Sequence, residues 1–423
     1  MGIGNRLPEV VTVTVVVVLF SFHDYRVQAQ QNPESFMEGL DAGITYTADI
    51  FANTRGGTGT GTRYMDNLDL EVSFDTDKGL GWGSTEFYIY GLANQGGNIS
   101  DLTGDIQGVN NIEAETSWRI YEAWLQKYIY ELRTSVLVGL YDLNSEFDVI
   151  NTATLFINSS HGIGPEYALS GVLGPSIFPY TSMALRLKSN PVDGFVLQGA
   201  VLDGIPSNPQ NTDGTKIFFR ERDGLLLSGE VAFYPNVDET MISRSRTARI
   251  RDFLDRGIGS ANCCKFALGG WLYTKERSGW QGAMQRNRGL YVLGEYRLFR
   301  EQGDEYQGLS GFFRYGIANE DINRLASYVG SGLVYTGLLK SRPRDQLGLA
   351  MALPFNSSEY ETLQAVSSPL TPTSYELNIE ATYRLEVKNF SFVQLDLQYV
   401  VNPGMVERNG HALVVGTRMQ LSL

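Results

Sequence analysis

The sequence predicts an all-β protein, a transmembrane antiparallel β-barrel of about 16 strands with short periplasmic turns and long extracellular loops. Three observations predict this fold class: apolar and polar side chains alternate along most of the chain, short and long connections also alternate, and no stretch after residue 30 is long and apolar enough for a membrane helix. Period-two alternation indicates strands whose two faces meet different surroundings. In hydrocarbon, a sheet satisfies its backbone groups only when it closes on itself.

Sixteen segments carry the alternation, and residues 375–386 show it most clearly. Leu377 and Ile379 fall on one face of that segment, and Glu376 and Glu380 fall on the other. In a closed barrel the apolar face meets lipid and the polar face meets a water-filled lumen. The segments are, in order, 40–51, 66–75, 80–91, 117–128, 133–141, 181–188, 194–202, 224–233, 265–273, 289–298, 307–316, 328–336, 345–353, 375–386, 390–401 and 411–423. The final segment stays in phase to apolar Leu423, which also favours an apolar solvent.

The connections predict which rim of the barrel carries the loops. The short connections are 76–79, 129–132, 189–193, 299–306, 337–344 and 387–389. The long connections are 52–65, 92–116, 142–180, 203–223, 274–288, 317–327, 354–374 and 402–410. Short turns on one rim and long loops on the other are typical of outer-membrane barrels. Residues 234–264 stand where a short turn is expected and are interpreted as an insertion, and glycine-rich 54–63 is expected to be a mobile loop.

The composition agrees with this fold and excludes some partners. Aromatic residues make up 12% of the chain, charged residues only 19%, and glycine reaches 46. The net charge of -13 provides no basic stripe to neutralise phosphates, so we expect no nucleic acid partner. Adjacent Cys263 and Cys264 lack the spacing of a zinc site or of an unstrained disulfide, and we interpret them as an inert pair.

The first 29 residues differ from the rest and are interpreted as a signal peptide. Arg6 precedes an apolar run at 10–22, and small residues near Ala29 suit cleavage. A helical span needs about 20 apolar residues, so the run is too short for a membrane anchor. Residues 30–423 are then expected to form one barrel domain.

Residues for catalysis or for holding a cofactor are scarce. The mature chain has two histidines, His161 and His411, which leaves little for a triad or a zinc site. Glycine-rich 56–61 and 79–83 lack the strand-then-helix context of a phosphate loop. We therefore expect no catalytic residue, no metal and no cofactor.

The polar face of the strands supplies candidate pore-lining residues instead. Both charge signs occur there, and acid–arginine arrays can hydrogen-bond hydroxyl-rich solutes. Each position also fits an ordinary hydrated wall. The candidates are Trp82, Glu86, Glu122, Trp124, Arg186, Lys188, Trp271, Glu295, Arg297, Arg314, Glu376, Glu380, Arg384, Asp396 and Arg418.

Several stretches resemble a known family. Residues 139–166, 178–209, 289–301, 307–319 and 397–404 are similar in order and spacing to the carbohydrate-selective porin family, OprB type, of bacterial outer membranes. The resemblance covers nearly the whole mature chain. It implies a sixteen-stranded outer-membrane barrel that lets sugars diffuse down their gradient.

The resemblance also implies that residues 142–180 form a constriction loop folded into the barrel. That role would fall to Asn144, Glu146, Phe147, Asp148, Asn158, His161 and Glu166. Two features depart from the family's pattern. Outer-membrane barrels commonly end in phenylalanine where this chain has Leu423, and the 234–264 insertion is longer than expected.

The function expected from these observations is passive diffusion of carbohydrates and other small hydrophilic solutes, with no reaction performed on them. The alternatives are a general or non-sugar channel, an outer-membrane barrel enzyme and a surface-binding barrel. Expected partners are outer-membrane lipid, lipopolysaccharide and the barrel-assembly machinery. A monomer and a homotrimer both fit the apolar faces, and the sequence leaves them open.

Overall fold

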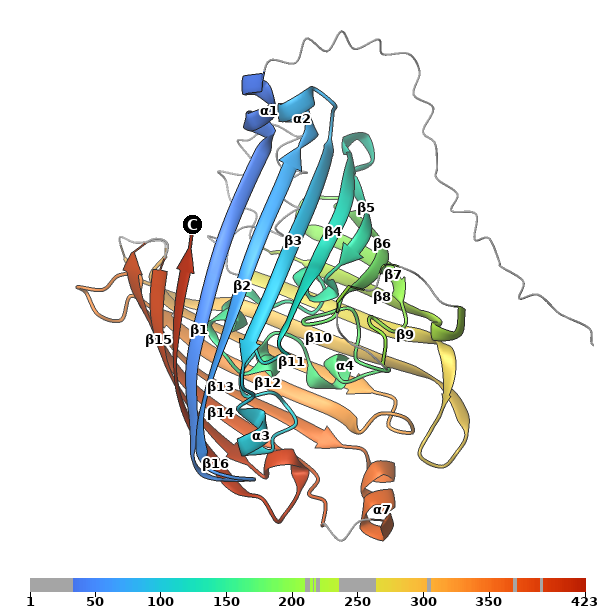
Figure 1. The fold of residues 1–423 in the computed structure, drawn as a ribbon, viewed down its shortest axis with the longest axis vertical. Coiled ribbons are helices and arrows are strands. Elements are labelled where there is room, and N and C mark those ends of the chain that lie inside the picture. Colours follow the sequence, from blue (N-terminus) through green and yellow to red (C-terminus); the bar gives the residue numbers. More distant parts are fainter. Residues whose placement is uncertain are drawn as a thin grey trace, which may run out of the picture.

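The computed structural model describes residues 33–209, 214–215, 217, 221–235, 264–302, 306–367, 371–388 and 391–423. Within these residues, the strands β1 to β16 form one closed barrel in which each strand pairs antiparallel with its neighbours in sequence (Figure 1). The fold class predicted from the alternation is therefore confirmed. None of the described helices is long and apolar enough to span a membrane.

The strands vary in length, and β1 and β10 are the longest, with 18 and 17 residues. Their bounds are β1 Leu40–Gly57, β2 Gly61–Asp75, β3 Thr85–Gly96, β4 Ser117–Ile129, β5 Thr134–Tyr141, β6 Ser182–Ser189, β7 Phe195–Asp203, β8 Leu225–Phe233, β9 Cys264–Ser278, β10 Met284–Arg300, β11 Gly308–Ala318, β12 Leu325–Thr336, β13 Gln346–Asn356, β14 Leu377–Lys388, β15 Ser391–Val401 and β16 Gly410–Ser422.

Short helices occupy the connections. The α-helices are α1 Pro33–Gly39, α2 Thr76–Leu80, α3 Ser100–Thr103, α4 Pro165–Ala168 and α7 Ser358–Ser367. The 3-10 turns are η1 Tyr130–Leu132, η2 Leu143–Ser145, η3 Asn151–Leu155, η4 Ser159–His161, η5 Glu221–Asp223 and η6 Pro403–Met405. In Figure 1, α1 and α2 lie at one end of the barrel, and α3 and α7 lie at the other.

The barrel closes where β1 meets β16. Thr45 pairs with Ser422 and Asp49 pairs with Arg418. The backbone pairing continues to the last residue, because the Leu423 N–H donates to the Ile44 carbonyl at 2.8 Å and the Ile44 N–H donates to the Leu423 carbonyl at 3.0 Å. The terminal strand thus removes the edges that an open sheet would present to lipid.

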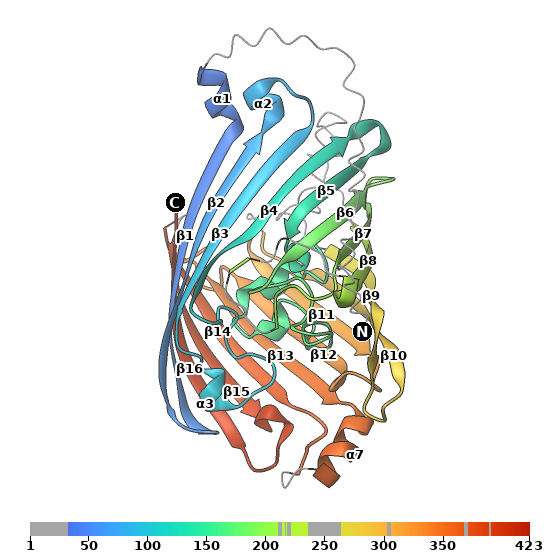
Figure 2. The same ribbon diagram turned by 45° about the vertical axis from the view of Figure 1, so that its right-hand side comes forward.

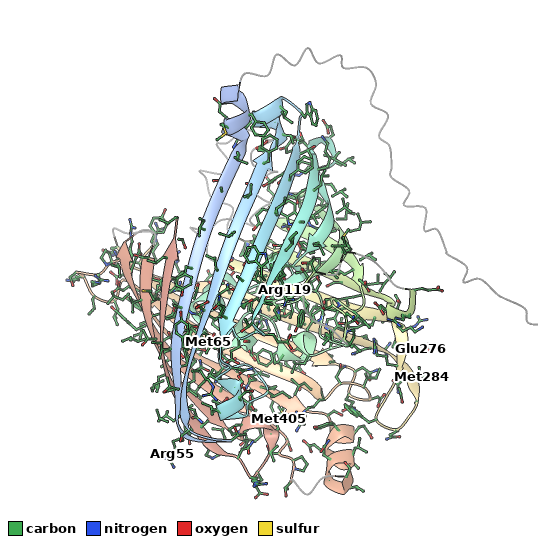
Figure 3. All side chains as sticks on the ribbon, in the orientation of Figure 1. Arg55, Met65, Arg119, Glu276, Met284 and Met405 are labelled. Atoms are coloured by element: carbon green, nitrogen blue, oxygen red, sulfur yellow. The ribbon has the colours of Figure 1, made fainter. Side chains whose placement is uncertain are left out.

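The two faces of the strands differ in burial as the alternation predicts. On β14, Ile379 is 41% exposed on the outer face, while neighbouring Glu380 on the inner face is fully buried. Side chains leave both faces of the strands, so the barrel interior is filled as well as surrounded (Figure 3). An aqueous lumen and a lipid exterior explain why one chain alternates so persistently.

Three segments differ from the sequence prediction. The long connection predicted at 274–288 is reduced to residues 279–283, because β9 and β10 extend into it. Residues 54–63 belong mostly to β1 and β2 and not to a loop, because the Asn53 side chain donates to the carbonyls of Gly56 (2.9 Å) and Gly59 (2.8 Å) and fixes a tight hairpin. Gly56 and Gly57 adopt φ of 69° and 68° there, a conformation that glycine tolerates.

The start of the third strand also differs, because it was predicted at residue 80 and is observed at Thr85. The Asp75 side chain accepts hydrogen bonds from the backbone N–H groups of Asp77 and Lys78 and caps α2, which Gly81 ends in a left-handed conformation. The capped turn takes residues that the alternation alone assigned to the strand.

Some predictions fall outside the described residues. These are the signal peptide at 1–29, most of the 234–264 insertion and Cys263. Cys264 begins β9 and is buried.

Candidate functional site in the barrel interior

The connection between β5 and β6 folds inside the barrel (Figures 1 and 2). These residues, 142–181, are termed the inner loop, and they contain η2, η3, η4 and α4. Leu143, Phe147, Leu155 and Tyr167 of the inner loop are buried in one cluster with inward-facing residues of the strands. Removal of this apolar surface from water stabilises the loop against the wall. The segment that the resemblance identified as a constriction loop therefore lies in the lumen.

Carboxylates of the wall hold the backbone of the inner loop. Glu295 of β10 accepts from the N–H of Asn151 at 3.2 Å and of Thr152 at 2.7 Å. Glu380 of β14 accepts from the N–H of Ile157 at 2.6 Å and of Asn158 at 3.0 Å. Short 3-10 turns leave such N–H groups without partners inside the turn, and the carboxylate oxygens of the wall accept from them.

Two more wall carboxylates act in the same way. Glu230 of β8 accepts from the Asp148 N–H at 2.9 Å, and Glu122 of β4 accepts from the Asp142 N–H at 2.9 Å. Lys265 of β9 lies 3.2 Å from the other oxygen of Glu230. These glutamates were expected to line a pore, with the exception of Glu230, which the sequence analysis did not select. Their observed contacts are with the loop.

Arg314 of β11 binds the inner loop from the side of its carbonyl groups. It lies 2.9 Å from Asp148, and it donates to the carbonyl oxygens of Ser160 (3.0 Å), His161 (3.2 Å) and Gly162 (3.0 Å). The guanidinium is almost completely buried. A planar fork of five donors suits several acceptors at once, so one arginine fixes two stretches of the loop, at Asp148 and at residues 160–162.

A second ionic anchor joins the start of the inner loop to β6. Glu146 lies 2.7 Å from Arg186 and 2.8 Å from Lys188. Burial alone would raise the pKa of Glu146, but the two cations outweigh it, and the pKa falls to about 2. Glu146 is therefore ionised throughout the physiological range.

His161 lies inside the loop packing and away from solvent. Its ring is 1% exposed and lies 5.0 Å from the Phe156 ring and 5.8 Å from the Phe312 ring, measured between centroids. Burial, with a smaller contribution from Arg314, lowers the pKa of His161 to about 3. The imidazole is neutral at physiological pH, and its surroundings are those of a core residue.

Close packing between the loop and the wall extends through aromatic and small residues. Tyr167 stacks on Trp271 of β9 with ring centroids 5.0 Å apart. Glu166 lies over Gly316 of β11, where an added Cβ would come within 1.6 Å of the carboxylate. Burial, aided by Asp148, raises the pKa of Glu166 to about 8. Gly316 is thus required for space and not for backbone conformation.

A second segment, 97–116 between β3 and β4, also folds inward. Ile99 and Val109 are buried in a cluster with Phe51 of β1. Glu376 accepts from the Ile106 N–H at 3.0 Å, and Arg418 pairs with Asp49 at 2.8 Å while donating to the Asn111 side chain at 2.7 Å. The sequence analysis treated this segment as an ordinary long connection. The apolar character of Ile99 and Val109, in a connection between strands, is the sequence signal that could have revealed its inward position.

Two regions of the inner face contrast in burial. The covered wall is the inner faces of β8–β13, where the inward-facing side chains in contact with the inner loop are buried. The open wall is the inner faces of β2–β4, where Asp69, Glu71, Tyr88, Tyr90 and Trp124 remain partly exposed. Four of these five were not selected from the sequence. Tyr88 and Tyr90 could have been, because they fall on the same face of β3 as Glu86, which was selected.

The remaining sequence candidates occupy three kinds of place. Trp82 lies in the turn after α2 and is 56% exposed, so it lies at the rim and outside any strand. Glu86, Arg297 and Arg384 lie on strands and are partly exposed. Asp396 of β15 is buried and accepts from Gln398 at 2.9 Å.

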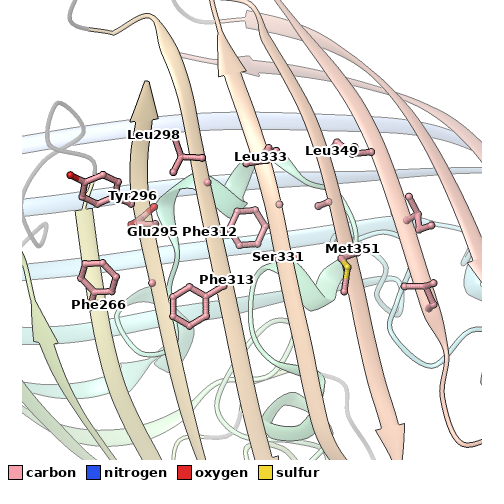
Figure 4. A pocket seen from close by; sticks show the side chains of 16 residues that line it. Phe266, Glu295, Tyr296, Leu298, Phe312, Phe313, Ser331, Leu333, Leu349 and Met351 are labelled. Carbon is pink, nitrogen blue, oxygen red and sulfur yellow. The ribbon is translucent and has the colours of Figure 1, made fainter. Parts of the chain in front are cut away.

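The outer face of the barrel carries an apolar groove of about 680 Å³ on β9–β14 (Figure 4). Small residues at Gly294, Gly311 and Ser331 leave the hollow between larger neighbours. The large lining residues labelled in Figure 4 include Phe266, Tyr296, Leu298, Phe313, Leu333 and Met351. An apolar outer face of this kind suits the hydrocarbon of a membrane.

Comparison with known proteins identifies the family to which this barrel belongs. Residues 59–423 match the family model described as carbohydrate-selective porin, OprB family. The chain belongs to this family. The resemblance noted in the sequence is thereby confirmed, and the protein is an outer-membrane porin through which carbohydrates diffuse passively.

Individual relatives of the porin agree with the family match. Porin B of Pseudomonas aeruginosa is 26% identical, with 92% of this chain and 88% of that protein covered. The high-pH structure of Pseudomonas putida OprB shares the fold with a TM-score of 0.76 at 23% identity, covering 92% of this chain and 96% of that one. The outer-membrane channel DcaP of Acinetobacter baumannii has a TM-score of 0.55 at 11% identity, covering 91% of this chain and 97% of that one.

Proposed function

We propose that carbohydrates cross this porin through a water-filled passage between the inner loop and the open wall. The observation that carries the proposal is a contrast in burial. The inward-facing side chains that contact the inner loop on β8–β13 are buried, whereas Asp69, Glu71, Tyr88, Tyr90 and Trp124 on β2–β4 are partly exposed. Exposed polar atoms in a lumen can exchange water for solute hydroxyl groups. The inner loop, by occupying the other side, narrows the channel and acts as its constriction.

The proposed solute contacts are fewer than the residues selected from the sequence. Glu86, Trp124, Glu146, Arg297 and Arg384 are partly exposed and remain candidates for lining the passage. The other wall carboxylates and Arg314 act as anchors of the inner segments. Selectivity then arises from the width left by the inner loop and from the charges of both signs around it.

Two serines of the inner wall allow a matched test. Ser73 of β2 is partly exposed on the open wall, and Ser228 of β8 is buried on the covered wall, where Tyr167 donates to it at 3.2 Å. We expect Ser73→Cys to react with a charged, water-soluble thiosulfonate and to lose conductance as it does so. Ser228→Cys is expected to stay unmodified under the same treatment.

The measurement is single-channel current in planar bilayers before and after the reagent, paired with liposome swelling in glucose and sucrose. The background for both variants is a form with Cys263 and Cys264 replaced by serine. Rapid modification of Ser228→Cys, with Ser73→Cys unreactive, would contradict the proposal, because the passage would then run along β8 and not along β2.

We also propose that the porin performs no reaction on its solute. His161, the histidine that a barrel hydrolase would need, is buried among Phe156 and Phe312. Glu295 and Glu380 are occupied by backbone N–H groups of the inner loop. Hydrolysis of a glycoside or ester that disappears in a His161→Ala variant would contradict this proposal.

We infer that the outer face contacts membrane lipid and lipopolysaccharide, that the barrel-assembly machinery inserts the chain, and that copies can associate as a homotrimer. The apolar groove and the exposed apolar rows of the outer face support contact with hydrocarbon or with another copy. Mass measurement in detergent, with lipopolysaccharide present or absent, distinguishes a monomer from a trimer. Depletion of the assembly machinery is expected to leave the chain unfolded in the periplasm.

A further inference from the structure

The open wall carries an aromatic surface built from adjacent strands. Tyr88 of β3 stacks on Trp124 of β4 with ring centroids 4.9 Å apart and planes inclined by 27°. Tyr90 follows on β3 with its ring centroid 6.4 Å from that of Tyr88, and Tyr121 meets Tyr90 edge-on at 5.0 Å. The rings support one another, so they present a fixed apolar surface in a lumen that is otherwise polar.

Two carboxylates on β2 border this surface in fixed positions. Glu71 accepts from the Tyr88 hydroxyl at 2.8 Å, and Asp69 accepts from the Tyr90 hydroxyl at 2.6 Å. The Asn67 side chain donates to the same oxygen of Asp69 at 2.8 Å. Among the described residues, Asp69 and Glu71 form no ion pair. Neither carboxylate has an oxygen that is buried without a hydrogen-bond partner. Each carboxylate on this inner face therefore keeps the capacity to accept a further hydrogen bond.

This combination matches the two kinds of surface that a sugar ring presents. A pyranose offers C–H groups on its faces, which pack on aromatic rings, and hydroxyl groups around its edge, which donate to carboxylates. An anion would be repelled by Asp69 and Glu71. An organic cation could also bind aromatic faces, and it is the competing occupant that the experiment must separate.

We propose that Tyr88, Tyr90 and Trp124, with Asp69 and Glu71, form a binding subsite for an uncharged pyranose ring on the open wall of the channel. This inference rests on the proposed passage, and it adds a position where the solute pauses. Binding there is weak and reversible, as a site in a diffusion channel must be if the solute is to leave. The residues select a ring with equatorial hydroxyl groups over a linear polyol of similar size, because only a ring covers the aromatic surface.

Trp124 has a matched control on its own strand. Trp118 of β4 is 59% exposed on the outer face, where it packs over Gly91. We expect Trp124→Leu to raise the glucose concentration that half-blocks the ion current by roughly three- to tenfold, as for the loss of one aromatic contact. Trp118→Leu is expected to leave that concentration unchanged. Trp124→Phe should lie between, and it serves if the leucine variant folds poorly.

The carboxylates have a control on β2. Asp66 lies on the outer face, where the Tyr64 hydroxyl donates to it at 2.7 Å. We expect Glu71→Gln and Asp69→Asn each to weaken glucose block by about threefold or more, whereas Asp66→Asn should have no effect. Sorbitol is the linear control solute, and tetramethylammonium is the cation probe.

The outcomes separate the subsite from the passage. If glucose neither permeates nor blocks the unmodified porin, the proposed passage itself fails. If glucose permeates but Trp124→Leu and Trp118→Leu behave alike, the passage stands and the subsite is wrong. Block by tetramethylammonium that depends on Trp124, with glucose block unaffected, would replace the pyranose with an organic cation and overturn the proposal.

Discussion

The covered wall and the open wall of this porin carry similar side chains in different circumstances. On the covered wall, Glu230 and Glu295 accept hydrogen bonds from the backbone of the inner loop. On the open wall, Asp69 and Glu71 accept from side chains of the strands themselves. The same apolar–polar alternation places both sets of carboxylates on the inner face. Whether an inward-facing charge anchors the fold or faces solute therefore depends on the loop above it.

The largest expected effect comes from Arg314 on the covered wall. Arg314→Ala removes the bonds to the carbonyl groups of Ser160, His161 and Gly162 and the ion pair with buried Asp148. We expect a loss of about 3–5 kcal/mol in stability, with larger and noisier single-channel currents as the inner loop loosens. Thermal unfolding in detergent, followed by circular dichroism, measures the first effect.

The control for Arg314 is Arg286, whose side chain is 60% exposed beside Glu276. Arg286→Ala should cost about 1 kcal/mol or less. Equal melting temperatures for the two variants would break the distinction between the covered wall and solvated positions.

A carboxylate from each wall provides a more direct contrast. Glu295→Ala leaves the N–H groups of Asn151 and Thr152 without their acceptor, at about 2–4 kcal/mol for the pair. Asp69→Ala removes a partly exposed acceptor, and we expect a cost below about 1 kcal/mol together with reduced preference for cations. Reversal potentials in a salt gradient report the preference. A stability loss at Asp69 equal to that at Glu295 would show that the open wall is also structural.

Glu166 makes the covered side sensitive to pH. Burial and Asp148 raise the pKa of Glu166 to about 8, whereas a free glutamate titrates near about 4.3. The folded porin keeps a proton that the unfolded chain releases, so the stability gained from this proton is complete below about pH 4.3 and is lost as the pH rises through about 8.

Melting temperatures at pH 6 and pH 8 test this dependence. The unmodified porin should lose about 2 kcal/mol more than Glu166→Gln between these pH values. Glu131→Gln, at an exposed position in the turn η1, is the control and should follow the unmodified porin. A parallel response of all three proteins would remove Glu166 as the cause.

The smallest expected effect concerns space beneath the inner loop. Gly316→Ala places a methyl group against the Glu166 carboxylate and is expected to cost about 1–2 kcal/mol. Gly199→Ala on β7 is the control, because its added Cβ comes no closer than 3.6 Å to a neighbouring heavy atom, the Ser228 carbonyl oxygen. If both substitutions are neutral in thermal unfolding, the loop is less tightly seated than its contacts indicate.

Alternation predicted the barrel well because lipid and water impose opposite demands on adjacent residues. Segments such as 117–128 and 390–401 lie within one residue of β4 and β15. The errors arose where side chains act on the backbone locally. Asn53 closes a hairpin within a glycine-rich stretch, and Asp75 caps a helix where a strand was expected.

The site was harder to predict than the fold. The apolar–polar alternation correctly placed Glu295, Arg314 and Glu380 on the inner face. Alternation cannot predict which loop residues will contact these side chains. Their partners are backbone groups of a loop more than a hundred residues away in sequence. Asp69 and Tyr90 became notable only when the structure left them uncovered.

The anchoring of the inner loop by later strands also constrains how the molecule comes into being. Ile157 is translated 223 residues before Glu380, the acceptor of its N–H, and Thr152 is translated 143 residues before Glu295. The loop cannot acquire its final bonds while the chain is still emerging or while β14 is unpaired. A chain that ended before β14 would leave the Ile157 and Asn158 N–H groups without Glu380, so the lumen is complete only when the late strands are in place.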